Sequence, residues 1–184
     1  MIRPVYIYGS PVLRKVAQDI DSTYPEIKEL IDDMFETMHH SDGIGLAAPQ
    51  IGLSIRVIVI DASPLEEDEP ELKDFRKVFI NAKIIERFGE KKFYKEGCLS
   101  IPNLREEVER EEKVRIQYLD ENFAPHDEIF DGIPARIIQH EYDHLEGMLF
   151  TDRVSALRRK LLTGKLNSIS KGKFDIDYKF KLAK

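Results

Sequence analysis

Two histidines and a glutamate in the run HEYDH have the types and spacing to hold and use a metal ion. His140 and His144 are four residues apart, and Glu141 directly follows the first histidine. On a helix, residues four apart lie on one face about one turn apart. Both imidazoles can then reach one metal ion, and Glu141 can reach a water bound to that ion. The run predicts a metal site but does not choose a reaction.

The alternative for these residues is an ordinary place in the core. A single histidine on an apolar helix face is usually a core residue that makes its own hydrogen bonds. Two imidazoles and a carboxylate on one inward face are harder to explain in this way, since burying them without partners costs several kcal/mol. A bound metal removes that cost, so the pattern favours a metal site.

The third metal ligand separates the classes of enzyme. In HExxH zinc endopeptidases it lies downstream as a His or Glu, but no histidine follows His144. Asp152, Asp175 and Asp177 remain as downstream candidates without signature spacing. The upstream candidate is the single cysteine, Cys98, which could also be a small buried apolar residue. A Cys-His-His set leaves a fourth position for water and therefore indicates a catalytic site.

Three segments together resemble the peptide deformylase family. GIGLAAPQ at 43–50 resembles the first family motif, EGCLS at 96–100 the second, and QHEYDH at 139–144 the third, in the same order. The resemblance covers nearly the whole chain up to about residue 155. It implies metal-dependent hydrolysis of the N-terminal formyl group from formyl-methionyl nascent polypeptides, with release of formate. Two alternatives stay open. One is a zinc endopeptidase of the HExxH type, and the other is a non-enzymatic protein in which a fourth protein ligand completes the coordination of the metal.

The resemblance also implies a role for each matching residue. The implied metal ligands are Cys98, His140 and His144. Glu141 would be the general acid and base, and Gln50 with the backbone N–H of Leu99 would form the oxyanion hole. Taken alone, Gln50 could be a polar loop residue and the glycines simple turn formers. The implied substrate-binding residues are Ile44, Gly45, Gly97, Arg105, Ile133 and Ile137.

Within that set, the residues serve different parts of the substrate. Ile44, Gly45 and Gly97 would hold the peptide backbone as an added strand. Ile133 and Ile137 face the same side as His140 and would line a pocket for the methionine side chain. Arg136 stands where some relatives have an apolar residue, which leaves its effect on the pocket rim open.

The implied cofactor is one divalent metal ion. The resemblance points to Fe²⁺ in the cell, and to Zn²⁺ or Ni²⁺ as ions that a purified sample can carry. The implied partner is the formyl-methionyl peptide. Nothing in the sequence requires a dimer, so a monomer is the default expectation.

Composition is typical of a soluble globular protein. The chain has 184 residues, of which 42% are hydrophobic and 34% are charged, which fits one domain over 1–184 with a sizeable core. No stretch approaches the roughly 20 apolar residues of a membrane span. The N-terminal residues lack the layout of a signal peptide, and a lone cysteine forms no internal disulfide. We therefore expect a cytoplasmic protein without membrane contact.

Charge is distributed unevenly along the chain. The net charge is −6, yet residues 158–184 hold 9 Lys or Arg against 2 Asp or Glu. A basic segment on an acidic body can bind a polyanion such as RNA, and for this family that suggests transient contact with the ribosome. The alternative is a solvated helix and strand, which we favour because no RNA-binding motif accompanies the charge.

The HEYDH run falls on a predicted helix that begins near Asp131, a good N-cap, with Pro134 in the first turn and Gly147 at its C-terminal end. Earlier, Thr23 and Glu26 have capping-box spacing, which predicts that a long amphipathic helix begins there and stops near Gly43.

Buried strands are expected between these two helices. Residues 55–63 are rich in β-branched side chains, and 77–89 read as strands with an irregularity at Asn81-Ala82. Residues 105–113 could be helix by composition, but even-numbered apolar positions such as Val108 and Val114 favour a strand. The glycine-rich stretch 43–52 should be irregular, and the acidic stretch 64–74 should be an exposed loop.

A last helix over about 155–169 and a closing strand over 174–180 complete the expected order of elements. Strands grouped between helices argue for an α+β fold. We expect mixed, mostly antiparallel sheets wrapped around a central metal-binding HExxH helix, with a helix near each end and a short C-terminal strand.

Overall fold

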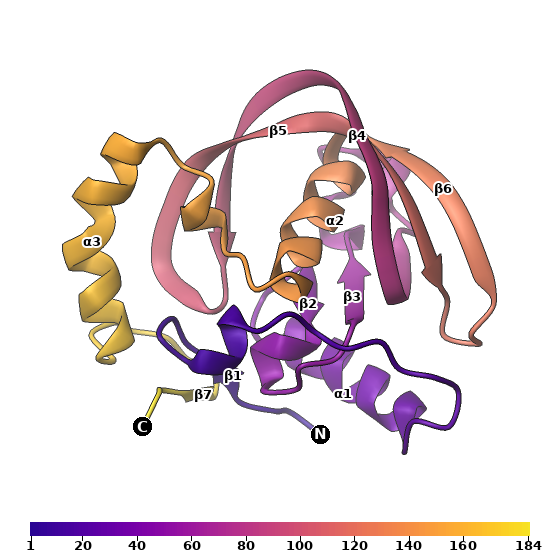
Figure 1. Ribbon diagram of the computed structural model, residues 1–184, viewed down its shortest axis with the longest axis horizontal. Helices are drawn as coiled ribbons and strands as arrows, with labels where there is room; N and C mark the ends of the chain where they lie inside the picture. Colours follow the sequence, from indigo (N-terminus) through magenta and orange to yellow (C-terminus); the bar gives the residue numbers. More distant parts are fainter.

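The computed structural model describes all 184 residues. The chain forms three α-helices and seven strands, joined by short 3-10 turns (Figure 1). The helices are α1 (Ile27–His40), α2 (Gly132–Leu145) and α3 (Ala156–Ser170). The strands are β1 (Val5–Tyr6), β2 (Gly45–Ala47), β3 (Val57–Asp61), β4 (Arg76–Cys98), β5 (Ile101–Leu119), β6 (Pro125–Asp131) and β7 (Phe180–Lys181). No helix is both long and apolar enough to cross a membrane.

Five strands form one antiparallel sheet in the order β2-β3-β4-β5-β6, while β1 and β7 form a separate parallel pair. The long strands β4 and β5 arch over α2, so that the HEYDH helix lies inside the curve of the sheet (Figure 1). The expected α+β architecture, with a mostly antiparallel sheet around this helix and a short C-terminal strand, is confirmed.

Side-chain patterning explains the strands. All five residues of β3 are buried, as expected for a continuous β-branched run inside a protein. In β5 the even positions face the core, with Val108 and Val114 fully buried, so the ambiguous segment 105–113 is a strand. The predicted irregularity at Asn81-Ala82 is a register shift between Ile80 and Lys83. It turns the Asn81 side chain onto the backbone of Ile20, to which it both donates and accepts.

The core divides around the sheet. One apolar cluster packs α1 against β2 and β3, and includes Met34 and Met38 of the helix. A second packs α2, through Ile138 and Leu145, against β3, β4 and β5. The second cluster fixes the helix that carries the histidines.

Three local predictions were wrong. α1 begins at Ile27, because Thr23 hydrogen-bonds Asp21 instead of capping the helix and Glu26 adopts a left-handed conformation with φ 53°. The stretch 43–52 is more regular than expected, since β2 pairs with β3 and a 3-10 turn, η2 (Ala48–Ile51), follows. The closing strand is limited to Phe180–Lys181, where β7 meets β1; residues 174–179 make loop contacts instead.

Candidate metal centre

Helix α2 and the end of β4 bring three metal-ligating side chains together. Ligand atoms of Cys98, His140 and His144 all lie within 4.8 Å of one another. Cys98 is the last residue of β4, so the sheet supplies one ligand and the helix the other two. The N-cap position of α2 is occupied by Asp131, as predicted, although its side chain makes no capping hydrogen bond.

Glu96 fixes the orientation of the first histidine. The Nδ1 atom of His140 lies 2.8 Å from Glu96 Oε1, and the Glu96 side chain is 5% exposed. Because Nδ1 is engaged by a carboxylate, Nε2 is the nitrogen left to face Cys98 and a metal. Burial alone would raise the pKa of the Glu96 carboxyl, but hydrogen bonds from His140 and Arg110 hold it well below its usual range.

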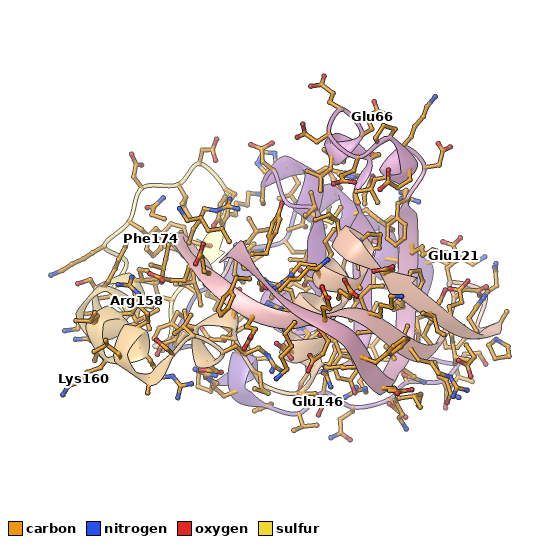
Figure 2. All side chains as sticks on the ribbon, turned by 90° about the horizontal axis from the view of Figure 1, so that it is seen from above. Glu66, Glu121, Glu146, Arg158, Lys160 and Phe174 are labelled. Atoms are coloured by element: carbon orange, nitrogen blue, oxygen red, sulfur yellow. The ribbon has the colours of Figure 1, made fainter.

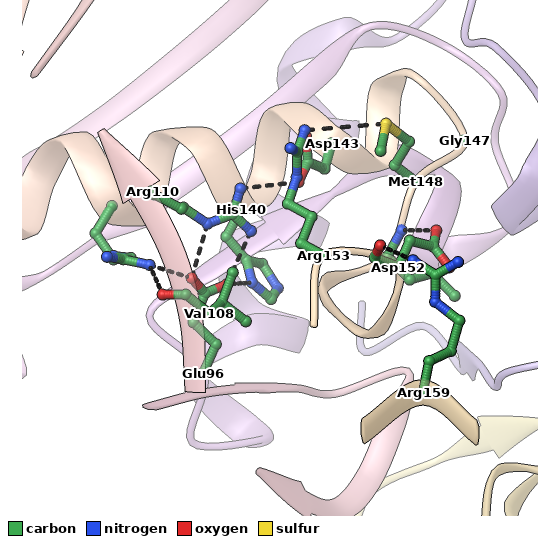
Figure 3. Close-up of polar contacts among 12 residues, drawn as sticks. Glu96, Val108, Arg110, His140, Asp143, Gly147, Met148, Asp152, Arg153 and Arg159 are labelled. Atoms are coloured by element: carbon green, nitrogen blue, oxygen red, sulfur yellow. Dashed lines mark hydrogen bonds and ion pairs between the residues drawn. The ribbon is translucent and has the colours of Figure 1, made fainter. Parts of the chain in front are cut away.

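Two arginines hold Glu96 in turn. Arg110 donates to both Glu96 oxygens, at 2.7 and 2.9 Å, and Arg136 donates to Glu96 Oε2 at 2.8 Å. Arg110 also donates to Asp143, which accepts from Arg153 (Figure 3). The result is a buried ionic network that ties β4, β5 and α2 together behind the histidines.

Cys98 is polarised toward its thiolate form. Its Sγ lies 3.4 Å from His144 Nε2. Burial would raise the pKa of the Cys98 thiol, but His144 and His140 together lower it to about 5. A thiolate and two imidazoles with converging ligand atoms form the donor set that a divalent transition metal takes. The residues present therefore fit a metal ion.

Glu141 is buried beside the three ligands. Its residue is 5% exposed and its Oε2 atom has no hydrogen-bond partner. Burial raises the pKa of the Glu141 carboxyl above its ordinary value, although the two histidines oppose this. Gly45 packs so closely that a Cβ there would lie 2.7 Å from Glu141 Oε1. A carboxyl with a raised pKa and a free oxygen in a cavity is suited to take and return a proton.

Two hydrogen-bond donors lie close to Cys98. Gln50, in η2, is oriented by the backbone N–H of Ala47, which donates to its Oε1 atom at 2.9 Å. Its Nε2 donates to Ser100 Oγ at 3.2 Å and lies 3.4 Å from Cys98 Sγ. The backbone N–H of Leu99 has no acceptor within the protein. Two neutral donors therefore lie beside the ligand cluster.

A cavity of about 400 Å³ opens onto this cluster. Most residues that the sequence singles out line it, namely Ile44, Gly45, Gln50, Gly97, Cys98, Leu99, Arg105, Ile133, Ile137, His140 and Glu141. His144 is 1% exposed and lies behind them. The downstream alternatives Asp152, Asp175 and Asp177 do not join the ligand cluster.

Sequence reasoning missed the groups that support the ligands. Glu96 was noticed only as part of a motif, and Arg110 was not singled out. Yet Arg110 is an even-numbered residue of β5, so the alternation that buries Val108 and Val114 also predicts a buried Arg110. A buried arginine requires buried acceptors. Arg136, whose effect on the pocket rim the sequence leaves open, lines the cavity. It donates hydrogen bonds to the backbone oxygens of Val108 and Lys92.

Comparison with known proteins places these features in one family. Residues 2–160 match the family model described as polypeptide deformylase. A peptide deformylase from Christiangramia forsetii is 50% identical, over 98% of this chain and 96% of its own. A peptide deformylase from Flavobacterium johnsoniae is also 50% identical, and the match covers 100% of this chain and 97% of that protein. The crystal structure of a peptide deformylase from Legionella pneumophila superposes with a TM-score of 0.80 at 36% identity, covering 94% of this chain and 98% of that one.

Proposed function

The chain belongs to the polypeptide deformylase family, and we propose from its cavity how it removes the formyl group from formyl-methionyl nascent polypeptides. The observation that carries the mechanism is the buried Glu141 carboxyl beside the converging ligand atoms of Cys98, His140 and His144. The endopeptidase alternative is not favoured, because the third ligand lies upstream and the family match is to deformylases.

Cys98, His140 and His144 hold one divalent ion, Fe²⁺ in the cell and Zn²⁺ or Ni²⁺ where a purified sample has taken up those metals. When bound, such an ion supplies an activated water and Lewis-acid polarisation of the formyl oxygen. Glu96 supports the site by keeping His140 in the tautomer that presents Nε2.

Glu141 moves the proton. Its carboxylate takes a proton from the attacking water and then donates it to the nitrogen of the leaving amine, so that formate and a free methionyl amine are released. The unpartnered Oε2 atom and the raised pKa of the Glu141 carboxyl support both halves of this step.

Gln50 Nε2 and the N–H of Leu99 stabilise the negative charge that develops on the formyl oxygen. Both are neutral donors next to Cys98, so they stabilise the oxyanion without adding charge to the ligand set. Arg105, at the cavity wall, lies near the peptide beyond the methionine.

The substrate lies against the short strand β2. The backbone of Ile44, Gly45 and Gly97 holds the peptide as an added strand, and Ile133 and Ile137 accommodate the methionine side chain. All five residues line the same cavity, which supports this placement.

The central test is the substitution Glu141→Gln, which keeps the shape of the side chain and removes its acid–base function. We expect deformylation of formyl-Met-Ala by protein purified anaerobically to fall about 10³-fold, within the range of general acid–base catalysis. Metal content should remain near one ion per chain. Glu146→Gln is the matched control, because Glu146 caps the same helix outside the cavity. Full activity in Glu141→Gln would reject the mechanism, and Cys98→Ala with retained stoichiometric metal would reject the ligand set.

The remaining features concern the whole chain. Residues 1–184 act as a single catalytic domain, monomeric and cytoplasmic.

The basic segment 158–184 makes transient contact with ribosomal RNA. Its support is the charge of the segment and the exposed position of Lys160 on α3, at the edge of the molecule (Figure 2). Co-sedimentation with ribosomes should weaken steeply as salt rises; binding that ignores salt, or no binding at low salt, would contradict this contact.

A further inference from the structure

We propose that Tyr178, in the segment after α3, is a positioning residue for the oxyanion hole, acting through the turn between β4 and β5. This rests on the function proposed above, in which the N–H of Leu99 is one of the two oxyanion donors. The Tyr178 hydroxyl donates to the carbonyl oxygen of Leu99 at 2.7 Å. The family match ends at residue 160, so this segment lies beyond the matched residues.

The turn that Tyr178 contacts is short and carries three adjoining groups of the site. Only Leu99 and Ser100 lie between the last residue of β4 and the first of β5. Cys98 brings the candidate ligand, Leu99 the backbone donor, and Ser100 the hydroxyl that accepts from Gln50. A small rotation of this turn would move donor and ligand together.

Each part of the turn is held from a different side. The Ser100 carbonyl accepts from the backbone N–H of Tyr8 at 2.8 Å. The Leu99 side chain packs against Gly43, where an added Cβ would lie 3.0 Å from Leu99 Cδ1. The Leu99 carbonyl has Tyr178 as its protein partner. This bond therefore fixes the peptide unit that directly follows the donor N–H, and it limits rotation at Leu99.

The tyrosine itself is anchored on both sides along the chain. Before it, Asn103 exchanges two hydrogen bonds with the backbone of Asp175. After it, the carbonyl of Lys179 accepts from Val5 at 2.9 Å, and β7 pairs with β1. Figure 1 shows β1 and β7 together below the turn between β4 and β5. The hydroxyl is thus presented to Leu99 by a segment that two separate attachments hold.

The consequence is a specific effect on catalysis. An oxyanion donor must lie within hydrogen-bond distance of the charged oxygen in the transition state, and losing one donor costs about 10²–10³-fold in kcat. Tyr178→Phe removes only the hydroxyl, so the donor becomes misaligned but not lost. We expect kcat to fall about 10-fold while KM stays within about twofold, because the interaction acts mainly in the transition state.

The matched control is Tyr6→Phe. The Tyr6 hydroxyl accepts from Lys181 Nζ at 3.3 Å, so this variant also removes one hydroxyl contact between the C-terminal segment and the rest of the protein, but none to Leu99 or Ser100. Both variants should keep one metal per chain. Only Tyr178→Phe should lower kcat and speed hydrogen exchange at the amide of Tyr8, which donates to the Ser100 carbonyl of the same turn. A kcat equal to that of Tyr6→Phe, or unchanged exchange at the Tyr8 amide, would overturn the proposal.

Failure of the two hypotheses can be told apart. If the unsubstituted protein does not deformylate formyl-Met-Ala, the proposed function fails. Exchange at the Tyr8 amide then still reports whether Tyr178 holds the turn. If the unsubstituted protein is active and Tyr178→Phe behaves as Tyr6→Phe does, only the positioning role fails.

Discussion

Helices α2 and α3 have nearly the same length, 14 and 15 residues. Each forms an ion pair with a residue of β5: Asp143 of α2 with Arg110, and Arg158 of α3 with Glu106. They differ in how they are held. Eight residues of α2 are buried, on more than one face, whereas α3 buries only Leu162, Leu166 and Ile169. One helix lies inside the arch of the sheet, and the other lies against its outside (Figure 1).

The difference extends to the charges. Arg110 and Asp143, which join β5 to α2, are both 2% exposed in their side chains. Arg158, which joins α3 to Glu106, is 49% exposed. Buried charges demand fixed partners and so impose one geometry, whereas exposed pairs are screened by water. The comparison suggests that this protein places rigid ionic contacts behind its chemistry and leaves α3 with an adaptable charged surface.

Removing one arginine from each region should give the largest contrast. Arg110→Met leaves two buried carboxylates with fewer partners, and should lower the free energy of unfolding by about 4 kcal/mol. Arg158→Met should cause no measurable change, because its pair with Glu106 is exposed to solvent. Urea unfolding with metal held constant provides the measurement. Equal losses in the two variants would mean that the two helices are held alike.

A pair of leucines tests the apolar part of the comparison. Leu145→Ala, at a fully buried position of α2, should cost about 3 kcal/mol through lost burial and a cavity. Leu161→Ala, at a position of α3 that is 63% exposed, should change stability by less than about 0.5 kcal/mol. Thermal and urea unfolding of both proteins would show it. A large loss at Leu161 would reveal a packing partner for α3 that this structure does not contain.

Two glycines allow the same substitution to have opposite consequences. Gly45→Ala would put a Cβ 2.7 Å from Glu141 Oε1 and displace that carboxylate, so kcat/KM should fall about 100-fold, or about 2.7 kcal/mol. Gly164→Ala meets no atom within 4 Å inside α3 and should stabilise the protein by about 1 kcal/mol with unchanged activity. Steady-state kinetics and unfolding on both variants decide this. Undiminished activity in Gly45→Ala would show that Glu141 can shift without loss.

Local sequence signals predicted the elements whose own residues determine them. Asp131 and Gly147 bound the HEYDH helix as expected, and alternation at Val108 and Val114 identified β5. The start of α1 could not be predicted in the same way. Thr23 has capping-box spacing, but the nearby Asp21 carboxylate competes for its backbone and hydroxyl donors.

Some residues of the site could likewise be predicted from local sequence, and others could not. Cys98 and His140 belong to short motifs, so their types and spacing were enough to suggest a cluster before the fold was known. The role of Glu96 depends on the register of β4 with β5, which pairs Tyr94 with Val108 and brings Arg110 within reach. Tyr178 gives no signal at all, because its partner is a backbone carbonyl, which any residue at position 99 would provide.

The pairing of β1 with β7 also sets an order of events in time. Val5 is synthesised early and Phe180 late, and their contact cannot form until the chain between them has been made. Closing so long a loop is entropically costly, and such non-local contacts form late in folding. The core around α2 depends on none of these residues. The scaffold around α2 therefore needs no residue after Leu145, whereas the bond from Tyr178 to the Leu99 carbonyl forms only once the C-terminal segment has been made.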